Sequence, residues 1–201
     1  MPTSASEPMR QYRVCKACQC HYSFIGAAYN CPLCGTIDYE KAFSHNLETI
    51  RKVPETIRVL RQHLAVDDAE SQAKMLVENA IEDIVTQFQT YAEHLFTSHL
   101  QASPVRPNLF QNLKEGSKAW EKLTGKTYQD MLSASEYARM NRYFQMRHKF
   151  GHTDGHVDAN YLHHSLDANY QLDQRLIAKE TDIINFTDLC QTLITGMKSS
   201  L

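Results

Sequence analysis

The sequence contains no run of about 18 consecutive apolar residues, which is roughly the minimum for a helix that crosses a bilayer. Its polar N-terminus, MPTSASEPMRQ, also lacks the apolar core of a secretory signal. Glycine and proline are scarce, at seven and six residues among 201, which leaves little room for low-complexity linkers. We therefore expect a folded cytoplasmic protein without a membrane span.

An excess of charge of either sign is missing as well. The 21 Lys and Arg residues nearly balance 23 Asp and Glu residues, so the formal net charge is -2. Proteins that coat nucleic acid by bulk electrostatics normally carry a basic face, and that class is therefore disfavoured, whereas a local basic site is not. The chain length suits one hydrophobic core together with a small appended module.

Cysteine is rare outside one short segment. Five of the six cysteines lie from Cys15 to Cys34, and Cys190 stands alone in a helical pattern near the C-terminus. In a reducing compartment such a cluster indicates a metal site rather than disulfides. Two C-x2-C pairs twelve residues apart can aim four thiolates at one zinc ion. We predict that a single structural Zn²⁺, with no open position for catalysis, is held by Cys15, Cys18, Cys31 and Cys34.

The cysteine segment, residues 13–36, resembles a zinc ribbon of the rubredoxin type, with CPLCG as its second turn. We expect short strands at Arg13–Cys15 and Ser23–Ile25. Cys20 is left over, because a C-x-C turn is a poorer chelator, and His21 would compete only by distorting the pair. Zinc ribbons serve nucleic-acid binding, protein docking or folding alone, so this segment does not choose among functions.

Beyond the ribbon, helical periodicity dominates the sequence. Residues 38–65 read as helix, which Pro54 should divide into two pieces. The strongest periodic stripe predicts a long core helix, which Asp67 or Asp68 is expected to cap and the QASPVRPN segment to end. That stripe consists of Val77, Ile81, Ile84, Phe88, Tyr91 and Leu95.

Four further helices are expected. One spans about Leu109–Thr124, with Trp120 as a core anchor and Gly125 as its C-cap. The next begins after Ser133, whose hydroxyl forms a capping box with Glu136. Asp158 should cap a short helix, and a closing amphipathic helix starts near residue 181 and buries the cysteine at 190. The pattern predicts a mainly α fold behind a small metal module, with residues 1–12 disordered and residues 37–65 forming connecting helices.

The stretch FQMRHKFGHTDGH, Phe144–His156, differs from ordinary helix packing. The apolar stripe of the preceding helix continues onto Arg147, and a guanidinium on an apolar face must pair, bind an anion or meet a partner chain. His152 follows five residues later, about 140° round an ideal helix. We therefore expect Gly151 to bend or end the helix so that the two side chains can meet.

The spacing Arg147-x4-His152 in RHKFGH resembles the R-x4-6-H motif of the HEPN superfamily. The resemblance covers about residues 65–201 and implies a four- to five-helix bundle over residues 66–201. It further implies a metal-independent endoribonuclease in which His152 moves a proton and Arg147 binds the scissile phosphate. His148, in the family's polar position, would orient the site or contact RNA.

The same resemblance implies partners and a setting. HEPN nucleases place two motifs face to face across a symmetric dimer, so we expect a homodimer with a composite site at its interface. The substrate would be RNA, in a cytoplasmic RNA-cleavage setting such as a toxin or phage defence. The zinc ribbon would recruit RNA or a partner protein.

Two other interpretations of the histidine-rich stretch stay open. In the first, the chain is a non-catalytic adaptor or regulatory protein, in which Arg147 pairs with an acid such as Glu93 or Asp154 and His152 closes the turn. In the second, a metal ion is bound by some of His148, His152, His156, His163 and His164. Histidines four residues apart chelate well only on a continuous helix, and the glycines at 151 and 155 favour a turn instead.

Overall fold

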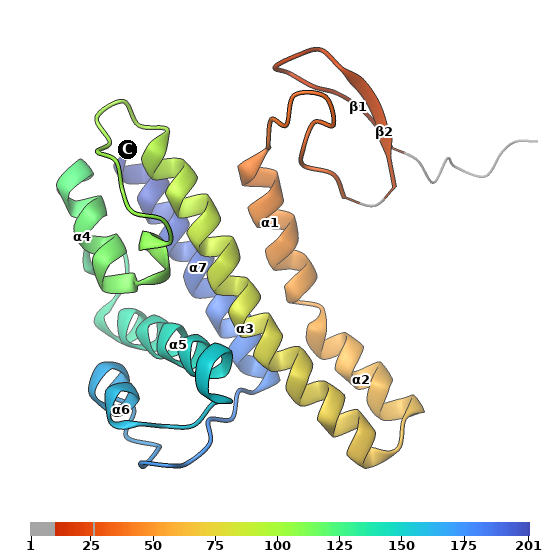
Figure 1. Cartoon of the computed structure of the whole chain (residues 1–201), viewed down its shortest axis with the longest axis vertical. Coiled ribbons are helices and arrows are strands. Elements are labelled where there is room, and N and C mark those ends of the chain that lie inside the picture. Colours follow the sequence, from red (N-terminus) through yellow and green to blue (C-terminus); the bar gives the residue numbers. More distant parts are fainter. Residues whose placement is uncertain (1–10, 26) are drawn as a thin grey trace, which may run out of the picture. The chain divides into compact units, whose positions relative to one another are not determined.

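The computed structural model describes residues 11–25 and 27–201 and divides the chain into two compact units, Met1–His45 and Asn46–Leu201. Figure 1 shows that helices make up most of the described chain, so the predicted mainly α fold is confirmed. The disorder predicted for residues 1–12 is wrong at Gln11 and Tyr12, which belong to the first β-strand, and residues 1–10 lie outside the described residues. No helix in the described ranges is long and apolar enough to cross a membrane.

The first unit contains two short antiparallel strands. Strand β1 (Gln11–Val14) pairs with β2 (His21–Phe24), one to two residues earlier than the sequence predicts. An isolated bridge joins Asn30 to Ile37. The described side chains provide few buried apolar groups here, so the two buried cysteines at 15 and 31 occupy the interior.

Two helices follow, and the break between them lies next to Pro54, as the sequence predicts. Helix α1 (Tyr39–Ile50) is separated from α2 (Val53–His63) by two residues, and Pro54 is the second residue of α2. At that position the missing N–H of proline would have no helical partner in any case. Ile57 anchors α2 with its side chain fully buried.

Helix α3 (Val66–Thr97) is the long core helix that the periodic stripe predicts. Five of the six stripe residues are buried, and Leu95 is half-buried. The predicted cap is wrong, because Ala65 is the N-cap residue and makes no side-chain capping bond. Asp67 and Asp68 lie inside the first turn, where carboxylates are stabilised by the positive end of the helix dipole.

The segment predicted as one helix from residue 109 forms two elements. A 3₁₀ turn, η1 (Leu109–Gln111), precedes α4 (Leu113–Thr124). Asn112 lies between them and caps α4, because its side-chain oxygen accepts a hydrogen bond from the backbone N–H of Glu115, the third residue of the helix. Gly125, with φ of 74°, ends α4 as predicted, and the fully buried Trp120 donates its indole N–H to the Ser200 hydroxyl at 3.0 Å.

Helix α5 (Ala134–Thr153) begins with the predicted capping box. The short helix α6 (Ala159–Ser165) follows it and is capped by Asp158, as predicted. The 3₁₀ turn η2 (Tyr128–Asp130) precedes α5, and α7 (Glu180–Ser200) closes the chain. Helices α5 and α7 both pack on α3 (Figure 1). Aromatic rings fill the space between them: the rings of Phe88 and Phe144 lie 5.7 Å apart, and those of Tyr143 and Phe186 lie 4.8 Å apart.

Candidate functional sites

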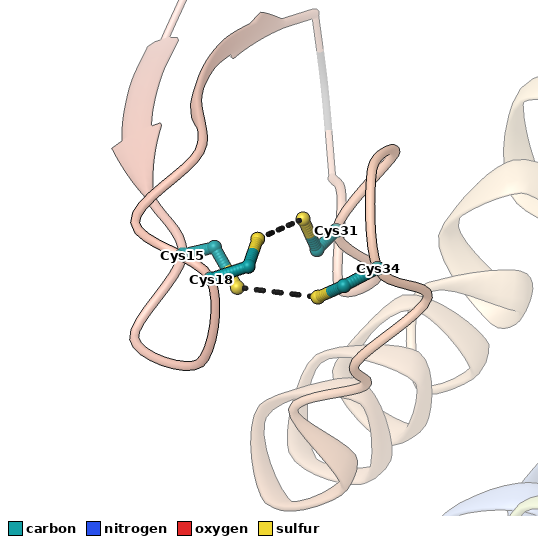
Figure 2. Close-up of side chains that lie close together, drawn as sticks. All are labelled: Cys15, Cys18, Cys31 and Cys34. Atoms are coloured by element: carbon teal, nitrogen blue, oxygen red, sulfur yellow. Dashed lines mark hydrogen bonds between the residues drawn. The ribbon is translucent and has the colours of Figure 1, made fainter.

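Four cysteines of the first unit meet in one cluster (Figure 2). The Sγ atoms of Cys15 and Cys34 are 3.7 Å apart, those of Cys18 and Cys31 are 3.6 Å apart, and all four lie within 4.8 Å of one another. A tetrahedron with Zn–S bonds of about 2.3 Å separates its sulfurs by about 3.8 Å. The four predicted ligands therefore fit a zinc ion, and Cys20 lies outside this set.

The two cysteine turns share one backbone geometry. In each, the first cysteine's carbonyl accepts a hydrogen bond from the N–H four residues on, at 2.9 and 3.0 Å. Its own N–H donates to the carbonyl five residues on, at 2.9 Å in both turns. The donor residues Gln19 and Gly35 have positive φ values of 57° and 70°. Cys20 thus occupies in the first turn the position that Thr36 occupies in the second.

The hydroxyl of Thr36 lies 3.1 Å from the Sγ atom of Cys34. This contact, together with the Thr36 backbone N–H, lowers the pKa of Cys34 to about 6. Partial desolvation and the nearby thiols raise the pKa of Cys20 instead. Because zinc binds the thiolate form, these surroundings favour Cys34 over Cys20 as a ligand.

The expectation that Gly151 bends the helix is wrong. Helix α5 continues through Gly151 to Thr153 and ends at Asp154 and Gly155, which have positive φ values of 49° and 75°. A glycine inside a helix costs only about 1 kcal/mol relative to alanine, and packing can offset it. Gly151 faces α3, where the Glu82 carboxylate lies 3.6 Å from the place of a Cβ atom.

Arg147 is half-buried at the edge of the core-facing stripe of α5. Its Nε atom is buried and has no hydrogen-bond partner, and the described residues offer the guanidinium no ion pair. Asp154, one of the acids considered for it, instead accepts a hydrogen bond from Arg175 at 3.0 Å. A buried N–H donor without an internal partner needs a water molecule, an anion or another chain.

His148 and His152 lie one helical turn apart, and both are exposed. Their ring centroids are 4.8 Å apart in an edge-to-face arrangement. Partial burial, with the neighbouring His152, lowers the pKa of His148. Because α5 is continuous, His152 points about 140° away from Arg147, so one chain brings the two histidines together but not Arg147 and His152.

Of the five histidines considered as metal ligands, the structure brings only His148 and His152 together on one helix. Among the described residues, the cysteine cluster is the single group of three or more potential ligands. His156 lies beyond the end of α5, and His163 and His164 are exposed on α6. His148 and His152 meet the requirement for a continuous helix, but they have no third ligand in the described part of the chain.

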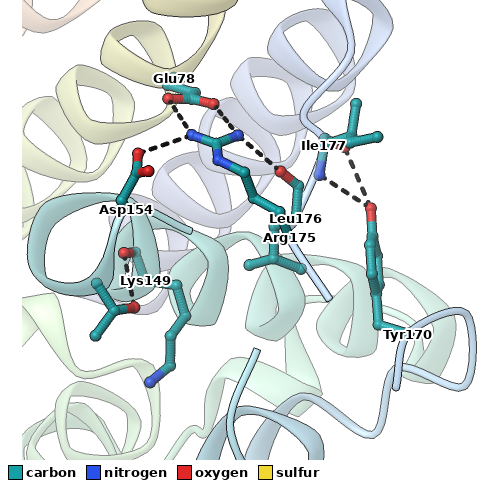
Figure 3. A network of polar contacts seen from close by, with 8 residues as sticks. Glu78, Lys149, Asp154, Tyr170, Arg175, Leu176 and Ile177 are labelled. Atoms are coloured by element: carbon teal, nitrogen blue, oxygen red, sulfur yellow. Dashed lines mark hydrogen bonds and ion pairs between the residues drawn. The ribbon is translucent and has the colours of Figure 1, made fainter. Parts of the chain in front are cut away.

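Two polar contacts near the end of α5 are not apparent from the sequence. Lys149 is buried and its ammonium lies 2.6 Å from the Asp158 carboxylate. Arg175 joins the Glu78 carboxylate of α3, at 2.8 and 3.2 Å, to Asp154 (Figure 3). Both pairings depend on folding, and no local spacing signals the contact between residues 78 and 175.

Compared with models of protein families, with curated proteins and with solved structures, the chain matches none. The resemblance to HEPN proteins therefore rests on the RHKFGH motif and on the mainly α fold. The assignment of the cysteine cluster as a possible zinc site rests on its sulfur geometry.

Proposed function

We propose that the helical bundle is a metal-independent endoribonuclease that acts as a homodimer. The observation that carries this proposal is Arg147, a half-buried cation on α5 whose Nε is buried without a hydrogen-bond partner. A phosphodiester oxygen is a strong acceptor for a guanidinium, and it would supply the partner that the described residues do not provide. Two exposed histidines, His148 and His152, lie on the same helix.

The residues suit transesterification of RNA. His152 would accept the proton of a 2′-hydroxyl while the 2′-oxygen attacks phosphorus and the 5′-oxygen departs, leaving a cyclic phosphate and, after proton transfer, a 5′-hydroxyl. Histidine is the side chain that most readily moves protons near neutral pH. Arg147 would stabilise the negative charge that develops on the non-bridging oxygens.

The continuous course of α5 supports a site that is shared by two chains. Since Arg147 and His152 diverge by about 140° on one helix, they do not face one phosphate from the same chain. Across a two-fold axis, Arg147 of one chain can approach His152 of the partner subunit. His148, whose ring contacts that of His152, would orient the imidazole or contact RNA.

A mixing experiment tests the activity and its composite nature together. Purified wild type should cleave single-stranded or transfer RNA, whereas Arg147→Ala and His152→Ala should each be inactive alone. Mixing the two variants in equal amounts, with exchange of subunits, should restore about one quarter of wild-type activity, because half of the dimers then carry one intact site.

Two controls accompany the mixing experiment. His163→Ala removes an exposed histidine from α6 and should leave cleavage unchanged. EDTA should leave cleavage largely intact, although it can remove zinc from the ribbon. Failure of wild type to cut any RNA, with both α5 variants altering only stability or association, would contradict the proposal.

A second candidate is a non-catalytic adaptor, and the uninterrupted helix at Gly151 favours it, because the motif is split within one chain. In that function the unpaired Arg147 would contact a partner protein, and the ribbon would provide a second docking surface. Such an adaptor would bind its partner through wild type but not through Arg147→Ala, with no RNA cleavage by either. The proposed RNA-cleavage or defence setting belongs only to the nuclease.

A further inference from the structure

A pocket of about 530 Å³ lies between α5, the segment that follows α6 and the start of α7. Three cationic side chains line it: Arg139 and Arg142, one turn apart on α5, and Lys179 at the beginning of α7. They come from segments about 40 residues apart and converge only in the folded bundle. The positive end of α7 borders the same space.

The two carboxylates of the pocket already have hydrogen-bond donors. Asp182 accepts from the Tyr143 hydroxyl at 3.0 Å and from the Lys179 backbone N–H at 2.7 Å. Asp167, which is buried, accepts from the Tyr161 hydroxyl at 3.2 Å and from the Asn169 side chain at 2.8 Å. These hydrogen bonds hold the two acids in place, and both carboxylates keep their negative charge.

The cations, by contrast, are weakly engaged. Arg142 approaches Asp167 only to 3.9 Å, which is beyond hydrogen-bond distance. The side chains of Arg139 and Lys179 form no ion pair within the described ranges, residues 11–25 and 27–201. With three cations and two carboxylates the pocket has a surplus of positive charge, and its guanidinium donors are available to a ligand.

We propose that this pocket binds the phosphate group of a phosphate monoester. A tetrahedral dianion can accept hydrogen bonds from two guanidinium groups and an ammonium at once, whereas a carboxylate is satisfied by a single guanidinium. The volume exceeds that of phosphate and lies in the range of small-molecule sites. Asn185 also lines the pocket, where its amide can contact the polar remainder of the ligand.

A phosphate monoester can belong to a small metabolite or to the end of an RNA strand, and the proposal does not depend on RNA cleavage. The zinc-loaded full chain would be titrated with inorganic phosphate, and with acetate at matched ionic strength, while backbone and arginine side-chain NMR signals are followed. Phosphate should shift signals of Lys179, Arg139 and Arg142, and acetate should not.

Glycerol 3-phosphate and a pair of RNA oligonucleotides, identical except for a 5′-phosphate or a 5′-hydroxyl, then distinguish the sources. Preference for glycerol 3-phosphate indicates a metabolite. Tighter binding of the phosphorylated oligonucleotide indicates an RNA end. Either result supports the site, whereas equal binding of the two oligonucleotides without any response to glycerol 3-phosphate overturns it.

Substitution of the pocket arginines tests whether phosphate binds in this pocket. Arg139→Gln and Arg142→Gln should each weaken phosphate binding about tenfold, the usual effect of losing one charge-assisted hydrogen bond. Arg58→Gln removes an exposed arginine from α2 and should change nothing. Arg139→Lys keeps the charge and should retain part of the affinity, which decides the matter if a glutamine variant fails to fold. An equal loss with Arg58→Gln, or signal shifts confined to other regions, would overturn the proposal.

Discussion

Gly151 and Gly155 lie four residues apart at the end of α5, and only the second has a backbone conformation that requires glycine. At Gly155, with φ of 75°, a Cβ atom would also meet the Phe150 ring at 3.1 Å. Gly155→Ala should therefore reduce the free energy of unfolding by about 1–2 kcal/mol.

Gly151→Ala is the matched control for this prediction. A Cβ atom at 151 makes ordinary contact with Glu82 and improves helix propensity, so the free energy of unfolding should rise by up to about 1 kcal/mol. Urea denaturation of both variants measures the difference. A loss at 151 as large as that at 155 would show that α5 bends at Gly151 in solution.

The cysteine cluster gives a second prediction at the scale of single residues. Cys34→Ser should lower the zinc content below one ion per chain after dialysis, because one of four thiolates is lost. Cys20→Ser should retain the ion, since Cys20 lies outside the set of four. Elemental analysis of both variants checks this. Zinc loss in Cys20→Ser with retention in Cys34→Ser would show that the ligands are exchanged.

Single residues also show why part of each site is predictable. Four cysteines at C-x2-C spacing can be recognised locally, because each turn needs only six residues to form its hydrogen bonds. The surroundings of Arg147 could not be recognised, because they depend on how distant segments pack; Asp154, for example, pairs with Arg175, a residue 21 positions away. The sequence thus identified the unusual arginine but not its surroundings.

Among the elements, α5 and α6 are joined by the buried Lys149 and the half-exposed Asp158. The hydrogen bond from Lys149 lowers the pKa of Asp158. The ion pair therefore stabilises the folded protein above the ordinary aspartate pKa. This stabilisation is lost as pH falls through the lowered pKa of Asp158.

Asp158→Asn should reduce the free energy of unfolding at pH 7 by about 1–2 kcal/mol, less than for a fully buried pair because Asp158 is half-exposed. Asparagine can still cap α6, so the change reports mainly on the charge. The difference from wild type should close as pH falls below about 4. Thermal unfolding across pH measures this, with the exposed Asp173→Asn as a control, and a difference that persists at low pH would contradict it.

Helix boundaries could be predicted from the sequence where their cause is local, but not where they depend on packing between helices. The capping box of Ser133 and Glu136 and the division at Pro54 were predictable because their causes lie within a few residues. Gly151 was misjudged because packing of α5 against α3 overrides a local preference. The ion pair of Lys149 with Asp158 could not be predicted, because Asp158 caps α6 and reaches Lys149 only through the turn between α5 and α6.

At the scale of the whole molecule, the two compact units are stabilised by different means. The first contains a cluster of four cysteines that could hold a zinc ion, and the second has a hydrophobic core that includes the single tryptophan, Trp120. Removing zinc with a strong chelator should unfold the ribbon and leave Trp120 buried, so its emission maximum should not move. A red shift on chelation, reversed by zinc, would show that the core also depends on the metal.

The overall mainly α fold followed from periodicity, which every helix carries in its own sequence. The phosphate pocket did not, because Lys179 lies 37 residues beyond Arg142 and the two converge only through the packing of α5 and α7. The same holds for any site assembled from distant segments. Fold class and metal ligands are therefore more accessible to sequence reasoning than binding pockets are.

The contacts of Arg175 also bear on folding kinetics. This side chain joins Glu78 and Asp154, which precede it by 97 and 21 residues, so the two ion pairs can form only after most of the bundle has assembled. Contacts absent from the folding transition state affect mainly the unfolding rate. Loss of Arg175 should then shorten the lifetime of the native state while the folding rate stays nearly the same, and the end of α5, with its histidines, would be the first part of that helix to open.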